Sequence, residues 1–218
     1  FKLQAAELAD VRSERVELAG AANTLSFRGD GIHADNTDGL GIVADITRNA
    51  GVPIAGRDVL LIGAGGAAAG ALGALLAEKP HRLIVSNRTQ ARAQALVAQH
   101  ATLASLHNVE LLELDFQALE AQKAQNFDLV INATASSLSG AEVPVPPSVL
   151  REQGLAYDMM YGPAAQPFLA WAVRHGTQAR DGLGMLVEQA AESFAIWRGV
   201  RPPSAQVLAE LRALLAQV

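Results

Sequence analysis

The sequence predicts an α/β fold built on a doubly wound, parallel sheet. Short apolar segments alternate with helical ones from about residue 59 to residue 175. Repeated βα alternation is typical of a parallel sheet with right-handed crossovers. In addition, the apolar run at residues 59–62 leads directly through the glycine-rich segment 63–66 into an alanine- and leucine-rich stretch. This order is the one expected for a strand, a tight turn and a helix.

The segments before the glycine turn predict a smaller, separate unit. Residues 3–20 are charged and alanine-rich and are expected to form one helix. Residues 24–27 and 32–34 read as two strands of a hairpin around the turn at 28–31. Residues 37–50 show a mixed apolar face and are expected to be helical. The stretch 51–56 holds two glycines and a proline, so we predict a domain boundary there.

The segments after the boundary are expected to follow in regular alternation. Proline cannot continue a preceding helix, so Pro202 and Pro203 should separate the last two helices. The predicted strands are 59–62, 82–86, 109–112, 128–132 and 155–159, and the predicted helices are 67–78, 91–100, a stretch ending at 119, 167–175, 184–197 and 205–217.

Composition narrows the function classes. Half of the 218 residues are hydrophobic, which suffices for one large domain or for one domain plus part of another. A net charge of −5 without a basic run argues against nucleic-acid binding. The absence of cysteine excludes disulfides and thiolate metal sites, and the five scattered histidines do not predict a metal site. No membrane span or signal peptide is visible, so we expect a cytoplasmic monomer or homodimer acting on a small molecule.

The glycine turn predicts a dinucleotide site of the Rossmann type. Gly63 would permit the tight turn, Gly65 would let the backbone approach a pyrophosphate, and Ala68 is small enough for close helix–strand packing. The helix start then offers free N–H groups and a positive dipole end to the anion. The alternative is a tight turn that needs small residues for packing only.

The end of the second strand favours NADP over NAD. NAD-binding folds carry an acidic residue about 20 positions beyond the glycines, and no carboxylate stands in the segment Val85-Ser86-Asn87-Arg88-Thr89. Arg88 and Arg92 are available instead, and a guanidinium matches a phosphate dianion. The alternative is that both arginines are ordinary solvated residues at a helix start.

Several short motifs, taken together, resemble the shikimate dehydrogenase family from the first residue to about residue 200. The resemblance implies reduction of 3-dehydroshikimate to shikimate with NADPH. The motifs are Gly20-Ala-Ala-Asn23-Thr24, Asp35-Asn36-Thr37-Asp38-Gly39, Gly63-Ala-Gly-Gly-Ala67, Asn87-Arg88-Thr89, Ile131-Asn132-Ala133-Thr134, Tyr157-Asp158-Met159-Met160-Tyr161 and the run Asp181-Gly182-Leu183-Gly184-Met185-Leu186-Val187-Glu188-Gln189-Ala190.

The same resemblance implies the site residues. Lys2 resembles the family's catalytic lysine, at the end of an N-V-T-x-P-F-K segment, and Asp38 resembles the aspartate paired with it. Asn23, Tyr161 and Gln189 resemble substrate-binding residues. The implied cofactor-binding residues are Gly63, Ala64, Gly65, Gly66, Ala67, Asn87, Arg88, Thr89, Arg92, Asn132, Thr134, Met159 and Gly182.

A lysine–aspartate pair suits this chemistry because hydride transfer to a ketone leaves negative charge on the carbonyl oxygen. Lys2 would supply positive charge and a proton, while Asp38 would orient the ammonium group. Without the resemblance, Lys2 would read as a solvated terminal residue and Asp38 as a helix-start residue. Gln189, in an otherwise apolar helix, would be a structural tie or a ligand contact.

The departures from the family pattern concern the substrate lobe. The family's serine pair for the substrate carboxylate is not present, and residues 132–137 lack a glycine that often follows Asn-Ala-Thr. We therefore expect residues 1–50 to be the C-terminal remnant of a substrate-binding lobe, 51–183 a Rossmann NADP domain, and 184–218 helices, the first of which packs back on that lobe. We also expect NADP binding without turnover by the chain as written. A quinate/shikimate dehydrogenase and a non-catalytic nucleotide-binding module remain alternatives.

Overall fold

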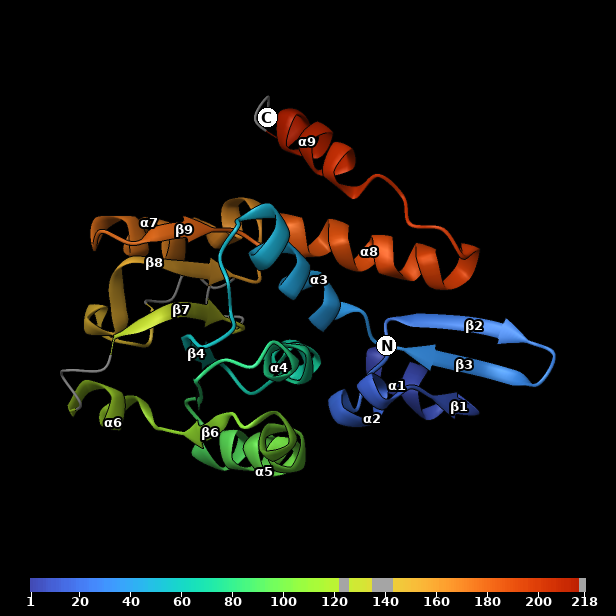
Figure 1. Cartoon of the computed structure of the whole chain (residues 1–218), viewed down its shortest axis with the longest axis horizontal. Helices are drawn as coiled ribbons and strands as arrows, with labels where there is room; N and C mark the ends of the chain where they lie inside the picture. Colours follow the sequence, from blue (N-terminus) through green and yellow to red (C-terminus); the bar gives the residue numbers. More distant parts are fainter. Residues whose placement is uncertain (122–125, 135–142, 216–218) are drawn as a thin grey trace.

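The computed structural model describes residues 1–121, 126–134 and 143–215. Its main feature is a six-stranded sheet in the order β6-β5-β4-β7-β8-β9, with every neighbouring pair parallel. The doubly wound parallel fold is thereby confirmed (Figure 1). The strands are β4 (Asp58–Ile62), β5 (Arg82–Ser86), β6 (Glu110–Glu113), β7 (Phe127–Asn132), β8 (Leu150–Asp158) and β9 (Gln178–Arg180).

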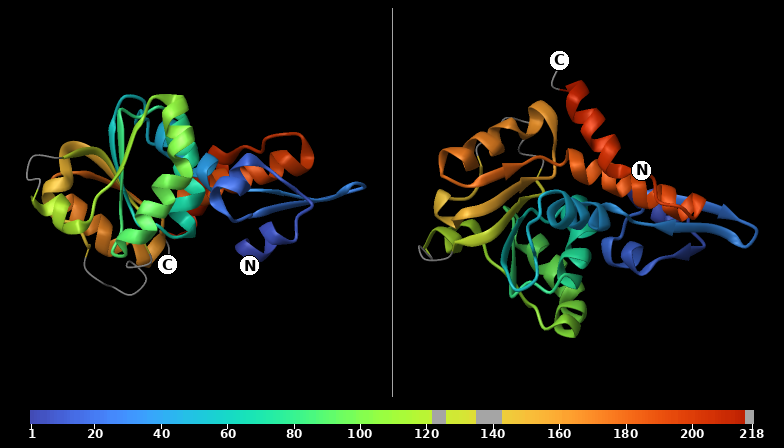
Figure 2. Two further views of the ribbon diagram at one scale, coloured as in Figure 1. Left: turned by 90° about the horizontal axis from the view of Figure 1, so that it is seen from below. Right: turned by 45° about the horizontal axis from the view of Figure 1, so that its top comes forward.

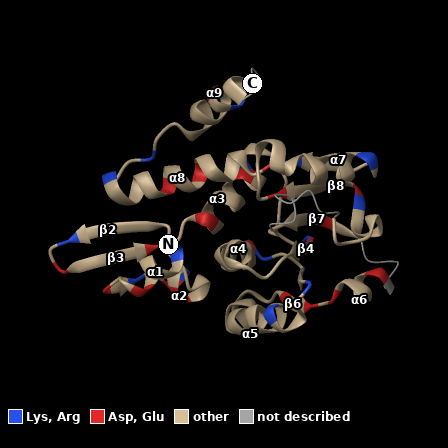
Figure 3. Ribbon diagram, turned by 180° about the vertical axis from the view of Figure 1, so that it is seen from behind, with Lys and Arg blue, Asp and Glu red and all other residues tan. Residues whose placement is uncertain are grey.

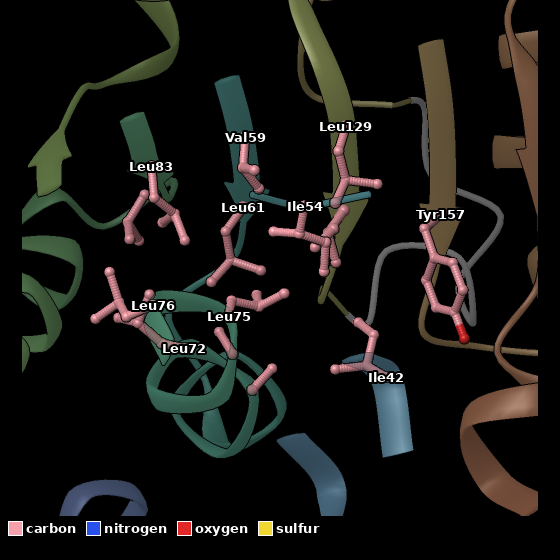
Figure 4. Close-up of a cluster of buried hydrophobic side chains, with 14 of the residues drawn as sticks. Ile42, Ile54, Val59, Leu61, Leu72, Leu75, Leu76, Leu83, Leu129 and Tyr157 are labelled. Atoms are coloured by element: carbon pink, nitrogen blue, oxygen red, sulfur yellow. The ribbon is translucent and has the colours of Figure 1, made fainter. Parts of the chain in front are cut away.

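Helices cover both faces of this sheet because its central strands are apolar on both sides. Val59 and Leu61 of β4 pack with one group of helices, whereas Leu60 and Ile62 pack with the other. The first group holds α3 (Asp38–Ala44), α4 (Gly66–Ala77), α5 (Gln90–His107) and α8 (Leu183–Arg198), and the second holds α6 (Phe116–Ala121) and α7 (Gln166–Arg174). Figure 4 shows the first core, with leucines of α4 facing Leu61 and Leu83 of the sheet.

A small three-stranded sheet lies beside this domain and carries the chain start (Figure 2). Its order is β1 (Val11–Arg12), β3 (Gly31–Asp35), β2 (Thr24–Arg28), and the β2–β3 hairpin was predicted. The prediction of one helix over residues 3–20 was wrong, because β1 separates α1 (Lys2–Glu7) from α2 (Glu14–Ala19). Asp10 binds the backbone of Ile32 through its own N–H and its carboxylate, and Ser13 caps α2.

The helix predicted over residues 37–50 begins as α3 and ends as a π-helical turn, η1 (Asp45–Asn49). Ile42 and Ile46 of this segment lie in the core of the large sheet. Strand β9 was not predicted. The last helix, α9 (Ser204–Leu215), follows the two prolines as expected, and the end of its predicted range at 216–217 lies outside the described residues.

Positive and negative side chains are mixed along the described elements. This distribution agrees with the argument from the sequence against nucleic-acid binding. Lysines, arginines, aspartates and glutamates are scattered along the ribbon (Figure 3). Within the described part of the chain, no helix has both the length and the apolar character needed to cross a membrane.

Candidate active site

One pocket gathers the residues that the motifs predicted as catalytic and substrate-binding. It lies where α1, the start of α3 and the start of α8 meet the loops that follow β8 and β9. Its lining consists of Lys2, Asn23, Asp38, Met159, Tyr161, Gly182, Met185, Leu186 and Gln189. Residues from the two ends of the chain thus share one cavity with two predicted cofactor residues, Met159 and Gly182.

An ion pair forms the polar side of this pocket. The Nζ atom of Lys2 lies 2.6 Å from Oδ2 of Asp38. The Lys2 side chain is 55% exposed, whereas that of Asp38 is 8% exposed. The buried carboxylate therefore holds an ammonium group that remains accessible from the cavity. The backbone near Lys2 is fixed by a bond from the Ala22 N–H to the Lys2 carbonyl. Asp38 is the first residue of α3, where a negative charge favours the helix dipole.

The orientation of Asn23 follows from its partners. Its Oδ1 accepts a hydrogen bond of 3.0 Å from the backbone N–H of Thr37, a group that only donates. Its Nδ2 therefore faces the other way and donates to Oδ1 of Asp38 at 2.9 Å and to Oε1 of Gln189 at 3.2 Å. Both oxygens of Asp38 accept hydrogen bonds from predicted site residues, which fixes the plane of the carboxylate.

Three buried hydroxyl groups support this arrangement, and the sequence reasoning missed them. Oγ of Ser193 lies 2.6 Å from Oγ1 of Thr24 and 3.2 Å from Oγ1 of Thr37. Both threonine hydroxyls also donate to Oδ1 of Asn23. Ser193 stands four residues after Gln189 on α8, and this spacing on one helix face was the available signal.

The opposite wall of the pocket depends on the close approach of two backbones. The N–H of Gly182 donates to the Met160 carbonyl at 2.8 Å, and a β-carbon at Gly182 would overlap the Met159 carbonyl. Only glycine fits here. Asp158 is buried beneath the wall, where its carboxylate accepts hydrogen bonds from Asn132 and from the Met160 N–H.

The glycine turn has the shape expected for a phosphate cradle. Gly63 has φ of +113°, and a β-carbon there would lie 3.1 Å from the Ala133 backbone, so the turn itself requires glycine. By contrast, β-carbons at Gly65 and Gly66 would meet nothing within 4 Å. The helix start at α4 is therefore open to solvent at the positions where backbone N–H groups would meet an anion, while Ala68 is fully buried against the sheet.

Two exposed arginines lie near this turn in the fold, at the end of β5 and in the first turn of α5. Among the residues that the structure describes, neither Arg88 nor Arg92 forms an ion pair. Asn87 donates to the Thr89 carbonyl at 2.9 Å and shapes the loop between them. Both arginine side chains are therefore available to bind an anion. Two guanidinium groups suit a phosphate group better than an uncharged ribose hydroxyl group.

All predicted cofactor residues lie at the carboxyl edge of the parallel sheet. The strand order reverses between the neighbours β4 and β7, and ligands of doubly wound folds bind at such a switch point. Gly63 follows β4, while Asn132 ends β7 and Thr134 follows it. Thr134 donates twice to the Asn132 side chain. Residues 135–137, where the motif departs from the family pattern, lie outside the described residues.

Family models match two parts of the chain. Residues 46–141 match the model for shikimate / quinate 5-dehydrogenase, and residues 182–212 match the model for the shikimate 5'-dehydrogenase C-terminal domain. The glycine turn and the predicted cofactor residues up to Thr134 fall in the first match, Gly182, Gln189 and Ser193 fall in the second, and Met159 falls in neither.

Relatives and solved structures match almost the whole chain. A shikimate dehydrogenase (NADP(+)) of Acidovorax sp. (strain JS42) is 72% identical over 216 residues, which are 99% of this chain and 75% of the relative. The crystal structure of an Ael1 enzyme from Pseudomonas putida is 47% identical, with a TM-score of 0.87, over 97% of this chain and 75% of that chain. Shikimate 5-dehydrogenase of Thermus thermophilus in complex with NADP(H) and shikimate is 28% identical, with a TM-score of 0.79, over 97% of this chain and 75% of that chain. The chain belongs to the shikimate dehydrogenase family.

Proposed function

We propose that this enzyme catalyses the NADPH-dependent reduction of 3-dehydroshikimate to shikimate in the pocket lined by Lys2, Asp38 and Gln189. The observation that carries the proposal is the Lys2–Asp38 ion pair, which shares a pocket with Met159 and Gly182 at the carboxyl edge of the sheet. A proton donor and the expected nicotinamide position thus lie around one cavity. Family membership and the NADP(+) dependence named for the relatives support the same reaction.

Bound NADPH supplies a hydride to the carbonyl carbon of the substrate. The ammonium group of Lys2 donates a hydrogen bond to the carbonyl oxygen and gives up a proton as negative charge develops there. Asp38 holds Nζ of Lys2 at 2.6 Å and keeps it oriented toward the cavity. In the reverse direction the same amine accepts the proton from the substrate hydroxyl group.

The remaining pocket residues would bind and orient the substrate. Asn23 and Gln189 present amide groups joined by a mutual hydrogen bond; the Thr37 N–H fixes the orientation of Asn23, and the Leu186 carbonyl, which accepts from Nε2, fixes that of Gln189. Such groups suit the hydroxyl groups of a polyhydroxylated ring. Tyr161 is 43% exposed and lines the same cavity, so its ring would cover the bound substrate from the solvent side.

The cofactor would be held along the carboxyl edge of the sheet. The open backbone at Gly65 and Gly66 would bind the pyrophosphate at the start of α4. Arg88 and Arg92 would bind the 2′-phosphate, since no carboxylate stands at the tip of β5. We further propose that residues 51–183 form the cofactor domain and that α8 returns from it to the substrate side.

The experiment that tests this proposal is an assay of NADPH formation from NADP with shikimate as substrate, made with a protein that carries the complete substrate lobe, since this chain covers 75% of the length of its relative. Quinate in place of shikimate, and NAD in place of NADP, provide the matched comparisons. We expect shikimate with NADP to give the highest kcat/KM. Equal or better rates with quinate would support the broader quinate/shikimate activity instead. In that protein, absence of shikimate-dependent NADPH formation alongside measurable NADP binding would reject the proposed reaction, whereas the chain as written is expected to bind NADP without turnover.

A further inference from the structure

A buried carboxylate that the mechanism does not use lies behind the pocket. Asp45 is fully buried at the junction of α3 and η1. Its Oδ1 accepts hydrogen bonds from Nη2 of Arg180 at 2.6 Å and from Asn49 at 2.9 Å. Its Oδ2 accepts from Nε of Arg180 at 3.0 Å and from the Tyr157 hydroxyl at 2.8 Å. A buried charge is costly unless it is paired and fully hydrogen-bonded, and Asp45 meets both conditions.

Two partners of Asp45 come from strands that end at the pocket wall. Tyr157 and Arg180 face each other in register on β8 and β9. Tyr157 lies two residues before Met159, and Arg180 lies two residues before Gly182. Burial and the charge of Asp45 raise the pKa of Tyr157 well above its ordinary value, so its hydroxyl stays protonated and keeps donating. The Asp45 carboxylate therefore binds one residue of β8 and one of β9, in each case near the carboxyl end of the strand.

The fit around Asp45 also involves the start of α8. A β-carbon at Gly184 would overlap the Asp45 carboxyl group, so only glycine allows α8 to begin this close to α3. One turn earlier in α3, a β-carbon at Gly41 would lie 2.7 Å from the Met185 carbonyl of α8. Met185 lines the pocket. The contact between Gly184 and Asp45 therefore belongs to the same α3–α8 packing that positions Met185 in the pocket wall.

Asp38 and Asp45 lie seven residues apart on one helical segment, which places them two turns apart on the same side of α3. At one end the segment holds Lys2 through Asp38, and at the other it holds β8 and β9 through Asp45. One short helical segment therefore connects the Lys2–Asp38 pair to the strands that lead to Met159 and Gly182.

We propose that Asp45 and Arg180 are positioning residues, whose buried ion pair sets the distance between the Lys2–Asp38 pair and the wall formed by Met159 and Gly182. The proposal rests on the proposed function for its kinetic consequence, because that wall would hold the nicotinamide. Hydride transfer is sensitive to such spacing, and a misplacement of about 1 Å can cost roughly 100-fold in rate. The pyrophosphate and phosphate contacts lie elsewhere, so cofactor affinity should depend on the pair much less.

The test compares Asp45→Asn, Arg180→Lys and Tyr157→Phe with a matched control, Asp58→Asn. Asp58 also forms an ion pair with an arginine, Arg82, but it is the first residue of β4, at the end of the strand away from the pocket. Steady-state kinetics with shikimate and NADP are measured for each variant in a protein that carries the complete substrate lobe. Hydrogen–deuterium exchange of the backbone over residues 159–162 and 182–186 provides a readout that does not require activity.

For Asp45→Asn we expect kcat to fall roughly 10- to 100-fold, with shikimate KM and the NADP dissociation constant changing far less. We also expect faster exchange over both wall segments. Arg180→Lys keeps the charge but loses the two-pronged contact, and Tyr157→Phe removes one hydrogen bond, so both should show smaller changes in the same direction. Asp58→Asn should lower thermal stability and leave kcat and wall exchange unchanged.

The pair would be merely structural if Asp45→Asn and the control gave the same pattern, with lower stability but unaltered kcat and wall exchange. Should Asp45→Asn not fold, Arg180→Lys and Tyr157→Phe decide the question by the same two readouts. An inactive parent protein would reject the proposed function instead, and the exchange data would still confirm or overturn the positioning role.

Discussion

The ammonium nitrogen of Lys2 lies 2.6 Å from the Asp38 carboxylate, although the two residues are 36 positions apart in the chain. This contact joins the first helix to the helix that enters the large domain. Asp38 also receives the Asn23 amide, so the helix start organises a donor and an amide around one buried carboxylate. The pocket chemistry therefore depends on how α1 and the segment that carries Asn23 are held against the start of α3.

The first prediction concerns Lys2→Ala in a protein with the complete substrate lobe, where it should lower kcat for shikimate oxidation by roughly 100- to 10,000-fold. A group that acts on charge developing in the transition state contributes mainly to kcat, so shikimate KM should change much less. Steady-state kinetics at saturating NADP provide the measurement. Lys2→Arg is the control for charge alone, because arginine keeps the positive charge but does not release its proton.

We expect Lys2→Arg to recover binding of shikimate without recovering most of kcat. Comparable turnover in Lys2→Ala and the parent protein would remove Lys2 from the mechanism. Full activity of Lys2→Arg would show that charge is sufficient and that the proton comes from another group.

The second prediction concerns Arg88→Asp, which should weaken NADP and improve NAD relative to it. A carboxylate at the tip of β5 repels a 2′-phosphate and accepts a hydrogen bond from a 2′-hydroxyl group. The ratio of kcat/KM for the two cofactors is the measurement. Arg174→Asp, at an exposed position in the last turn of α7, is the matched control and should leave that ratio unchanged. An unaltered ratio in Arg88→Asp would mean that Arg88 does not contact the phosphate.

The large sheet could be predicted from sequence because its strands are buried on both faces and therefore appear as continuous apolar runs. Residues 59–61 and 83–85 are fully buried, and both runs were assigned to strands. Strand β9 was not predicted because it has only three residues, Gln178–Arg180, with polar side chains at both ends. Strand β1 was missed because it has only two residues, Val11–Arg12. Both are short edge strands whose pairing depends on tertiary contacts rather than on a local pattern.

The site residues also fall into those that the sequence predicted and those that it did not. The glycine turn and the residues in the motifs could be identified because their identity is required by a turn, a close approach or a reaction. The hydroxyl groups that surround Asn23 could not be predicted. Thr24, Thr37 and Ser193 are common polar residues that meet only in the folded chain. Asp45 and Arg180 are 135 positions apart, and no spacing rule brings such a pair together.

The third prediction contrasts two glycines of the turn. Gly65 has extended backbone angles that valine also adopts, and a β-carbon there meets no protein atom within 4 Å. Gly65→Val should therefore fold normally but bind NADP roughly tenfold or more weakly, a loss of at least about 1.4 kcal/mol, because the side chain stands where the pyrophosphate must approach. Calorimetric titration with NADP measures the affinity, and thermal unfolding measures the fold.

The matched variant is Gly63→Val, where the positive φ and the nearby Ala133 backbone leave no room for a side chain. We expect this variant to lose stability, by roughly 1–3 kcal/mol from backbone strain alone. If Gly65→Val bound NADP with the parent affinity, the open positions at the start of α4 would serve packing and not the cofactor. Equal stability of Gly63→Val and the parent would contradict the structure of the turn itself.

The last prediction concerns the acid stability that Asp58 contributes. Burial would raise the pKa of this carboxyl, but hydrogen bonds and charge from His81 and Arg82 outweigh it and lower the pKa below its usual 3.8. A carboxyl whose pKa is lower in the folded state stabilises the fold above its unfolded pKa, and this contribution disappears as pH falls through the folded pKa. Urea unfolding of the parent protein and Asp58→Asn at several pH values between neutrality and strong acid provides the measurement. The difference in free energy of unfolding should shrink as the pH falls below about 4. A difference that persisted unchanged in strong acid would show that Asp58 acts through its shape and hydrogen bonds and not through its charge.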